Sequence, residues 1–389
     1  MSIEHLSDEQ VEDLMNRYYA GEDQKKLTEE FQIKVTNGRL YTLFPSIVRE
    51  DLDPCPYCGI YPTQKRASKT KMRDGYRLPV PFCTECGHNY SGSCNCQNCL
   101  SKHKKEELLA EKELEDKIQA EMYGTRDSAI TVNQLSLKEA VDLISLERGG
   151  REEDNDIIRA IKYFDRPAGP SQDYSVNALK HLYKNKLIDF SPSTSTDHFE
   201  ISGKRLEIRN YSTVYWKLHL GRDLNETIDI IDNIRSCLCK YEKWPSNWQF
   251  EFYDLWLTLA LHENIQFLKI MLDTYNLPCR IGDKTIRALR SLLDTFSISQ
   301  SYYFIYASVR DASAYQRKNG VSVLKAMFTI PGNIHRLAEK AICEEWVIKK
   351  YSRNTRCPES LSTTIFSNVV AQFHSKYFDK CPYNMLDSL

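Results

Sequence analysis

The chain lacks the long apolar runs that a membrane protein needs. No stretch of its 389 residues approaches the roughly 20 consecutive apolar residues that span a bilayer. The polar start of the chain, Met1–Ser7, also lacks the apolar segment of a secretory signal. These absences exclude a transmembrane helix and a signal peptide, so we expect a soluble, cytoplasmic protein with no membrane partner.

Common catalytic motifs are missing as well. The sequence contains neither a Gly-x-x-x-x-Gly-Lys phosphate loop nor a Gly-x-Gly-x-x-Gly motif, which excludes the usual nucleotide-binding signatures. His262-Glu263 has no second histidine at the spacing of a zinc protease, and His374 and Asp379 follow no known catalytic spacing. We therefore expect a protein that is not an enzyme, with a nuclease centre built from distant acids beyond residue 225 as the alternative.

The net charge is close to zero, but the charged residues are unevenly distributed along the sequence. The formal net charge is −1, whereas nine Lys and Arg between Pro54 and Lys105 face only Asp74 and Glu85, a local charge of +7. The rest of the chain must therefore carry −8. A basic block of this size favours an anionic partner, and nucleic acid is the usual one.

Cysteine is plentiful, and its spacing indicates metal binding. Seven of the thirteen cysteines fall between Cys55 and Cys99 in short-spaced clusters. In a reducing compartment such clusters favour metal over disulfides, which are the alternative. The other six cysteines are scattered, and we expect them to be buried free thiols. They are Cys237, Cys239, Cys279, Cys343, Cys357 and Cys381.

Two Cys-x-x-Cys-Gly knuckles form the first cluster, with ligands Cys55, Cys58, Cys83 and Cys86. Four thiolates suit tetrahedral zinc, and the glycine after each knuckle allows a tight turn around the sulfurs. The 24 residues between the knuckles suit a β-hairpin arm. Residues 55–99 resemble the zinc ribbons of bacterial nucleic-acid-binding proteins, and this resemblance implies a structural Zn²⁺ site.

A second cluster follows directly and contains Cys94, Cys96 and Cys99. Three thiolates this close would repel one another without a cation, so we expect a second Zn²⁺. His103 is predicted as the fourth ligand, and His88 competes with it. The alternative is that these cysteines extend or replace the first site.

Residues 1–50 predict three short helices. Ser7 and Gln10 form a capping box for the first, Asp23 caps a second over 24–31, and a third covers about 36–44. Residues 7–44 resemble a helix-turn-helix in their apolar positions, although Gln32 stands where that family usually has glycine. The resemblance implies that five residues face the DNA groove: Lys34, Thr36, Asn37, Arg39 and Tyr41. The alternative is a helical hairpin that supports the zinc module.

Basic side chains are concentrated between the two knuckles. They are Lys65, Arg66, Lys69, Lys71, Arg73 and Arg77. On a hairpin arm these side chains would point away from the metal and contact phosphates, which would make binding salt-dependent. Solvated charge and a protein-docking arm are the alternatives.

Residues 104–123 predict a charged linker helix with a narrow apolar seam of Leu114, Ile118 and Met122. The seam suits either packing on the chain's own body or pairing with a second copy. Residues 124–222 then predict helices at 137–146, 154–164 and 176–186, followed by strands at 187–190, 199–201, 206–208 and 214–220. This order resembles a winged helix with Lys204, Arg205 and Arg209 near the wing, and a plain α+β domain is the alternative.

Residues 223–389 predict an α-helical domain. The clearest sign is a core face at helical spacing, formed by Ile298, Tyr302, Ile305, Val309 and Ala312. Gly320 then supplies a C-terminal stop. The C-terminal half is expected to contact a protein partner or a second copy of the chain.

The expected fold class is therefore a multidomain, mainly α protein. Its predicted domains are 1–50, 51–103, 104–123, 124–222 and 223–389. The expected function is that of a zinc-containing protein that binds nucleic acid, with DNA as the preferred target, as in a regulator. The chain as a whole resembles bacterial proteins that join such an N-terminus to a helical body. The alternatives are an adaptor in a phage-defence or mobile-element complex and an enzyme that processes nucleic acid.

Overall fold

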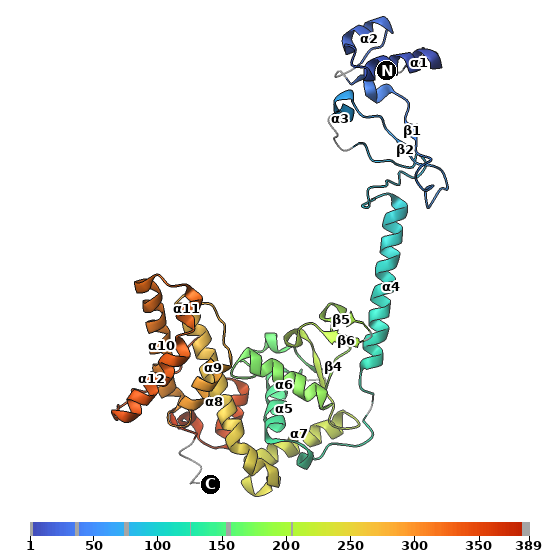
Figure 1. Ribbon diagram of the computed structural model, residues 1–389. Helices are drawn as coiled ribbons and strands as arrows, with labels where there is room; N and C mark the ends of the chain where they lie inside the picture. The colour runs from blue at the N-terminus through green and yellow to red at the C-terminus, as the bar shows by residue number, and fades with distance from the viewer. Residues whose placement is uncertain are drawn as a thin grey trace. The chain divides into compact units, whose positions relative to one another are not determined.

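The computed structural model describes residues 3–35, 39–73, 78–124, 126–152, 157–203 and 205–382. The chain divides into two compact units, Met1–Glu113 and Leu114–Leu389, whose elements can be followed in Figure 1. The described residues are mainly helical and contain three small antiparallel sheets, which confirms the prediction of a mainly α protein. None of their helices is both long and apolar enough to cross a membrane.

Two capped helices open the N-terminal unit. At the start of α1 (Asp8–Tyr19), the Ser7 side chain accepts the Gln10 backbone N–H, and the Gln10 side chain accepts the Ser7 backbone N–H. This reciprocal pair confirms the predicted capping box. Asp23 caps α2 (Gln24–Glu30), as predicted. The remaining elements of this unit are η1 (Leu40–Leu43), β1 (Ile47–Val48), β2 (Thr63–Gln64), α3 (Lys69–Arg73) and the N-terminal part of α4 (Gln97–Glu121).

The third predicted helix is much shorter than expected. Thr36 and Asn37 lie outside the described residues, and the described part of 36–44 holds only the 3₁₀ helix η1. Arg39 has a non-helical backbone (φ −113°, ψ 62°), and Phe44 is extended because Pro45 follows it. The turn before this segment is made by Gln32 with φ +52°, the conformation that a glycine usually supplies. After α2, the described residues of 31–47 therefore contain no helix long enough to read a groove.

The segment between the knuckles is not a β-hairpin arm in its described residues. β1 pairs with β2, and the chain then folds back onto the first helices. The Tyr19 hydroxyl donates to the Ala67 carbonyl at 2.7 Å, and Lys69 Nζ donates to the Glu22 carbonyl at 2.8 Å. Arg66 Nε donates to the Pro45 carbonyl at 2.9 Å. The described basic residues between 65 and 73 thus lie on a segment that packs against α1.

Small sheets and helices alternate in the first half of the C-terminal unit. One sheet has the order β3-β7-β4, and β5 and β6 form a separate hairpin. The elements are η2 (Val132–Gln134), α5 (Leu137–Gly150), β3 (Ile157–Ile158), η3 (Ile161–Tyr163), α6 (Gln172–Lys184), β4 (Ile188–Phe190), η4 (Thr196–His198), β5 (Phe199–Ser202), β6 (Arg205–Ile208), η5 (Tyr211–Thr213), β7 (Trp216–Leu218) and α7 (Leu224–Cys239).

The predicted helix over 154–164 is wrong in its described residues. Ile157 and Ile158 instead form β3, where they pair with Lys217 and Trp216 of β7. β-Branched isoleucines suit this pairing, and Ile158 is fully buried by it. The three-helix pattern expected of a winged helix is therefore not formed here. Of the wing residues, Lys204 lies outside the described residues, and Arg209 makes an exposed ion pair with Glu200 at 3.2 Å.

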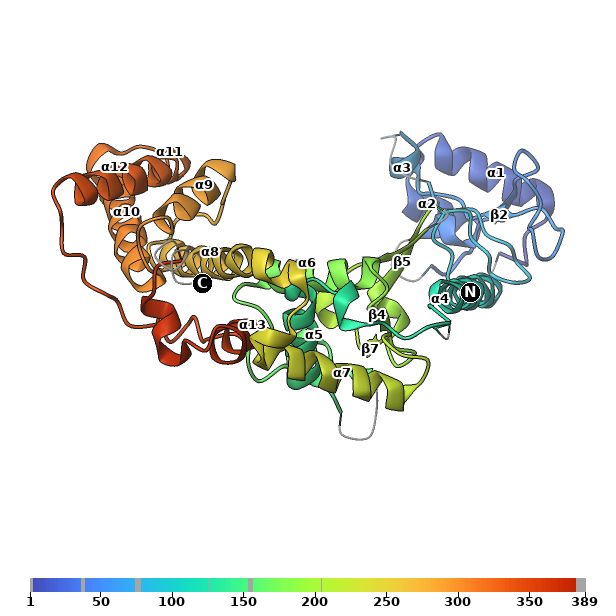
Figure 2. The same cartoon turned by 90° about the horizontal axis from the view of Figure 1, so that it is seen from below.

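The second half of the C-terminal unit is helical, as predicted. It contains η6 (Tyr241–Lys243), α8 (Ser246–Thr274), α9 (Asp283–Leu292), α10 (Ile298–Asn319), α11 (Val323–Met327), α12 (Ile330–Cys343), α13 (Leu361–Ile365), the π-helix η7 (Phe366–Val370) and η8 (His374–Asp379). α8 contacts both α5 and α10, which lie beside different parts of its length (Figure 2). Every residue of the predicted α10 core face is fully buried, and Gly320 ends the helix with φ +60°.

One hydrophobic core runs through the C-terminal unit from Ile130 to Tyr377. The regions predicted as separate domains, 124–222 and 223–389, therefore share this core. The α4 seam of Leu114, Ile118 and Met122 also packs against it, so the seam is covered by the chain itself. Of the six scattered cysteines, Cys237, Cys357 and Cys381 are buried as expected. The prediction is wrong for Cys239, Cys279 and Cys343, which are exposed.

Candidate metal centres

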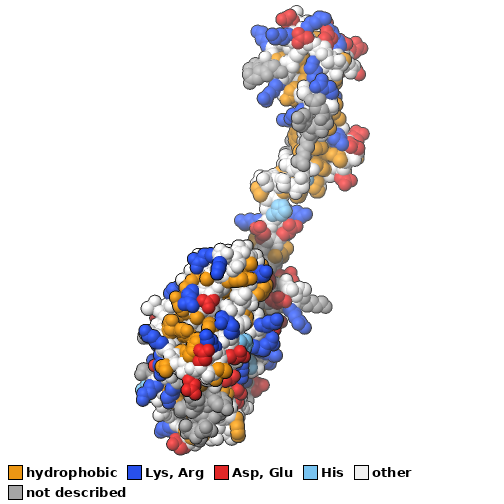
Figure 3. All heavy atoms as spheres, turned by 60° about the vertical axis from the view of Figure 1, so that its left-hand side comes forward, with side chains coloured by type: hydrophobic (Ala, Val, Ile, Leu, Met, Phe, Trp, Pro, Cys, Tyr) orange, Lys and Arg blue, Asp and Glu red, His pale blue; other side chains and the backbone are white. Residues whose placement is uncertain are grey.

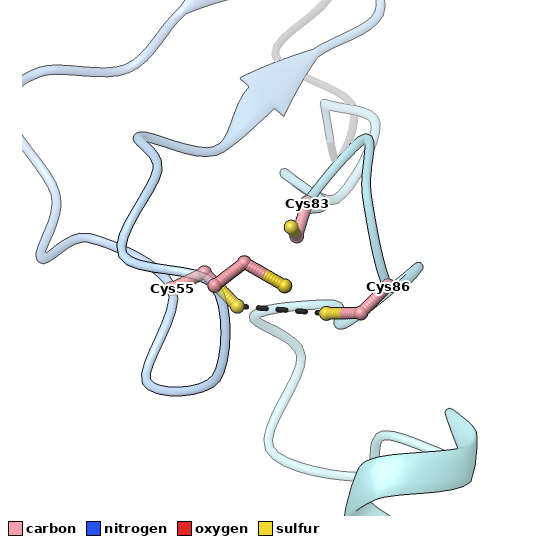
Figure 4. A group of neighbouring side chains, drawn as sticks. Cys55, Cys83 and Cys86 are labelled. Atoms are coloured by element: carbon pink, nitrogen blue, oxygen red, sulfur yellow. Dashed lines mark hydrogen bonds between the residues drawn. The ribbon is translucent and has the colours of Figure 1, made fainter.

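The first cluster brings the four knuckle cysteines together. All four sulfurs, those of Cys55, Cys58, Cys83 and Cys86, lie within 4.8 Å of one another. Cys55 Sγ and Cys86 Sγ are 3.6 Å apart, and the labelled sulfurs point toward one another (Figure 4). A tetrahedral ion with Zn–S bonds of roughly 2.3 Å would place its ligand sulfurs about 3.8 Å apart. The donor set and its spacing therefore fit zinc.

Both knuckles fold in the same way. The Gly59 amide donates to the Cys55 carbonyl at 2.9 Å, and the Gly87 amide donates to the Cys83 carbonyl at the same distance. Gly59 (φ +70°) and Gly87 (φ +67°) adopt the left-handed conformation that these turns require, as their position in the motif predicted. An isolated β-bridge between Thr63 and Phe82 connects the two knuckle segments. No disulfide forms among the described residues, which include all thirteen cysteines.

The second cluster consists of His88, Cys94, Cys96 and Cys99, whose ligand atoms also lie within 4.8 Å of one another. His88 Nδ1 is 3.3 Å from Cys99 Sγ and 4.0 Å from Cys96 Sγ. These distances bracket the separation of about 3.6 Å expected for a nitrogen and a sulfur on one tetrahedral zinc. Three thiols and one imidazole form a common donor set for structural zinc.

Backbone amides stabilise the thiolate form of Cys94, the form that binds a metal cation. The Asn89 amide donates to Cys94 Sγ at 3.2 Å, and the Cys96 amide donates to it at 3.4 Å. These hydrogen bonds stabilise the thiolate and lower the pKa of Cys94 to about 6. Tyr57 of the first knuckle reaches the second cluster, because its hydroxyl lies 3.3 Å from Cys99 Sγ.

His88, and not His103, is the histidine that the fold brings to the cysteines. His103 lies four residues beyond Cys99 on α4, a spacing that keeps both side chains on one face of the helix, but its ring is not among the ligand atoms that the fold brings together. Its side chain is 69% exposed, and its Nδ1 lies 3.6 Å from Glu106 Oε2. His88 is fixed by its own backbone, because its carbonyl accepts the Cys83 amide at 2.7 Å and closes the second knuckle. In the sequence, the position of His88 two residues after Cys86 indicated that it could be the fourth ligand.

Replacing these two histidines is expected to separate their roles. His88→Ala should lower the zinc content of the purified full-length protein from two ions per chain to one, because the second cluster loses a ligand. His103→Ala should leave two ions per chain, since this exposed side chain is not among the ligand atoms of either cluster. Elemental analysis of metal per chain is the measurement. Two ions in the His88→Ala protein would contradict the assignment.

The predicted nucleic-acid-binding residues occupy different environments. Lys34, Arg39, Lys65, Lys71 and Arg73 are exposed, whereas Arg66, Lys69 and Tyr41 are half-buried. Arg66 and Lys69 donate to backbone carbonyls and stabilise the fold of the unit. Thr36, Asn37 and Arg77 lie outside the described residues.

The sequence matches no protein-family model, and neither a curated protein nor a solved structure matches it. Two cysteine-rich clusters that could hold zinc ions are therefore the firmest functional feature of the chain.

Proposed function

We propose that the N-terminal unit binds two structural Zn²⁺ ions and uses the ordered basic segment between its knuckles to bind nucleic acid, with DNA as the main target. The observation that carries this proposal is that the segment packs on α1 while two of its lysines stay exposed. Each cluster offers four protein ligands, which is the composition of a closed structural site. Zinc therefore supports the binding surface and does not itself take part in chemistry.

Lys65 and Lys71 are the candidate phosphate contacts. Both side chains are exposed, and neither forms an ion pair with an acidic residue that the structure describes. Lys65 Nζ lies 5.7 Å from the centre of the Phe82 ring, beside the second knuckle. Because these lysines lie on a segment that is already folded, the segment need not become ordered when they contact phosphate, and the entropic cost of binding is lower.

The binding is expected to depend on phosphate more than on sequence. Between α2 and β1, the described residues form only the short 3₁₀ helix η1, so base contacts by a recognition helix that follows α2 lack support. Basic and acidic side chains are intermixed on the face shown in Figure 3. Because Arg66 and Lys69 donate to backbone carbonyls, we expect the exposed lysines of the segment to carry the affinity. Binding through phosphates is sensitive to salt and tolerant of sequence.

Reversal of two lysine charges tests the proposal. Lys65→Glu combined with Lys71→Glu is expected to weaken DNA binding about tenfold or more and to reduce the salt slope by about 2, roughly 0.9 per lost phosphate contact. Electrophoretic mobility shifts with the full-length protein at several salt concentrations are the measurement. The matched control is Lys284→Glu with Lys325→Glu, two exposed lysines of the C-terminal unit, which should bind like the parent.

An unchanged affinity and an unchanged salt slope in the Lys65/Lys71 protein would overturn the proposal. A protein partner that co-purifies after nuclease treatment, and is lost in the same variant, would instead assign the basic segment to protein docking.

A further inference from the structure

The small sheet of β1 and β2 is extended by a third segment next to the first zinc cluster. Val48 of β1 lies opposite Thr63 of β2, and Thr63 in turn lies opposite Phe82. The backbone amides of Thr63 and Phe82 donate to each other's carbonyls at 2.8 Å. Residues that lie opposite one another in an antiparallel sheet place their side chains on the same face. Val48, Thr63 and Phe82 therefore share one face, which we call the Thr63 face.

Tyr61 and Lys65 belong to the same face. The residues directly before and after Thr63 are buried, whereas Tyr61 and Lys65, two positions away on either side, are exposed. Successive side chains of an extended chain point to opposite faces, so this alternation places Tyr61 and Lys65 beside Thr63. The Lys65 side chain agrees with this placement, because its Nζ lies 5.7 Å from the centre of the Phe82 ring.

Apolar side chains of the Thr63 face are open to solvent. Tyr61 is 45% exposed, and among the described residues its ring has no aromatic neighbour and its hydroxyl has no hydrogen-bond partner. Val48 is 54% exposed, and the Phe82 ring is half-buried. Single exposed apolar residues are common, but two rings and an aliphatic side chain on one face indicate a surface that binds something.

The positive charge of the Thr63 face comes from Lys65. Its ammonium forms no ion pair with an acid that the structure describes. The Arg49 amide donates to the Pro62 carbonyl at 2.9 Å, which places the turn after β1 beside the start of the middle segment. Glu50, an exposed acid in that turn, therefore lies toward the Tyr61 end. An anionic group would be attracted to the opposite end, where Lys65 lies.

We propose that the Thr63 face binds single-stranded nucleic acid, with an unpaired base stacked on Tyr61 and a phosphate of the same strand beside Lys65. This inference rests on the proposed nucleic-acid binding and specifies its target. The bases of a duplex stack on one another and present only their edges in the grooves, so a protein ring can stack only on an unpaired base. Every base has a face that can stack, and such binding therefore tolerates many sequences.

Fluorescence anisotropy with the zinc-loaded, full-length protein tests this inference. A labelled oligothymidylate of about 16 nucleotides, which is long enough for a site of this kind, should bind at least about fivefold more tightly than its duplex with oligoadenylate. Preferential binding of an oligouridylate over its duplex would support single-strand binding equally and would assign the face to RNA.

Tyr61→Ala should weaken binding of the single strand at least about fivefold, the effect of losing one stacked base. Its salt slope should equal that of the parent, because no phosphate contact is lost. Tyr61→Phe should bind like the parent, since the ring is retained. Tyr315→Ala, which removes an exposed tyrosine of the C-terminal unit, is the matched control and should also bind like the parent.

The zinc content of the Tyr61→Ala protein shows whether its knuckles stay folded. Two ions per chain are expected, because Tyr61 is not a ligand of either cluster. The comparison of strand with duplex needs no variant and tests the inference independently of this substitution.

Equal binding of strand and duplex, or unchanged strand binding in Tyr61→Ala, would overturn the inference. If Lys65→Glu with Lys71→Glu still lost affinity, the proposed nucleic-acid binding would stand and only the stacking face would be wrong. If that lysine variant left all binding unchanged, the proposed function itself would fail. Unchanged strand binding in Tyr61→Ala together with loss of a co-purified protein would assign the face to protein docking.

Discussion

Removal of zinc is expected to unfold the knuckle region of the N-terminal unit and to leave the C-terminal unit folded. The N-terminal unit has one small hydrophobic cluster, whose buried members are Leu14, Tyr18, Leu27, Ile33, Leu40 and Phe44. The knuckle region after it depends on the two cysteine-rich clusters, since β1 and β2 have only two residues each. Structural zinc in small domains supplies roughly 10–16 kcal/mol of folding free energy, far more than a cluster of six side chains can replace.

Limited proteolysis and hydrogen exchange of the full-length protein, before and after dialysis against a chelator, measure this effect. Protection should be lost between residues 45 and 99 once the zinc content reaches zero, while the core of the C-terminal unit stays protected. The described residues of that unit contain no cluster with metal-ligand spacing, which explains the expected difference. Cys83→Ser should reproduce the loss in the N-terminal unit. Cys343→Ser, a change at an exposed cysteine of the other unit, should not.

Protection that survives complete removal of zinc would show that the knuckles fold without metal. The structural role proposed for zinc would then be wrong, even if the clusters still bind the ion.

Features encoded by neighbouring residues could be predicted from the sequence. The capping box of Ser7 and Gln10, the buried face of α10 and the two Cys-x-x-Cys-Gly turns each depend on residues within a few positions of one another. Spacing is enough to reveal such features, because the helix period and the left-handed turn act locally.

Features that depend on distant contacts could not be predicted in this way. The Tyr19 hydroxyl and the Ala67 carbonyl are 48 positions apart, and their hydrogen bond helps to fold the predicted arm back onto α1. β3 forms because Ile158 pairs with Trp216 on a strand far along the chain, which overrides the helical pattern. The choice between His88 and His103 depended on the folded knuckle, because a histidine four residues beyond Cys99 on a helix is also at ligand spacing, and only the tertiary fold brings His88 to the three cysteines.

Arg353→Met is expected to destabilise the C-terminal unit by about 3–5 kcal/mol, the usual effect of removing one partner of a buried ion pair. Glu263 lies on α8 with only 3% of its side chain exposed, and Arg353 donates to its two oxygens at 2.6 and 3.2 Å. Burial raises the pKa of Glu263, and the nearby guanidinium opposes this by stabilising the carboxylate. Without Arg353, the protein must either bury an unpaired charge or protonate the carboxyl group.

Urea unfolding of the full-length protein, followed by a signal from the C-terminal unit, measures this loss. Arg209→Met is the matched control, because its pair with Glu200 is 57% and 47% exposed and should contribute less than about 1 kcal/mol. The double variant Glu263→Gln with Arg353→Met should recover part of the stability, since it leaves no buried charge. If the single and double variants were equally destabilised, lost packing of the arginine stem, and not the unpaired carboxylate, would be the cause.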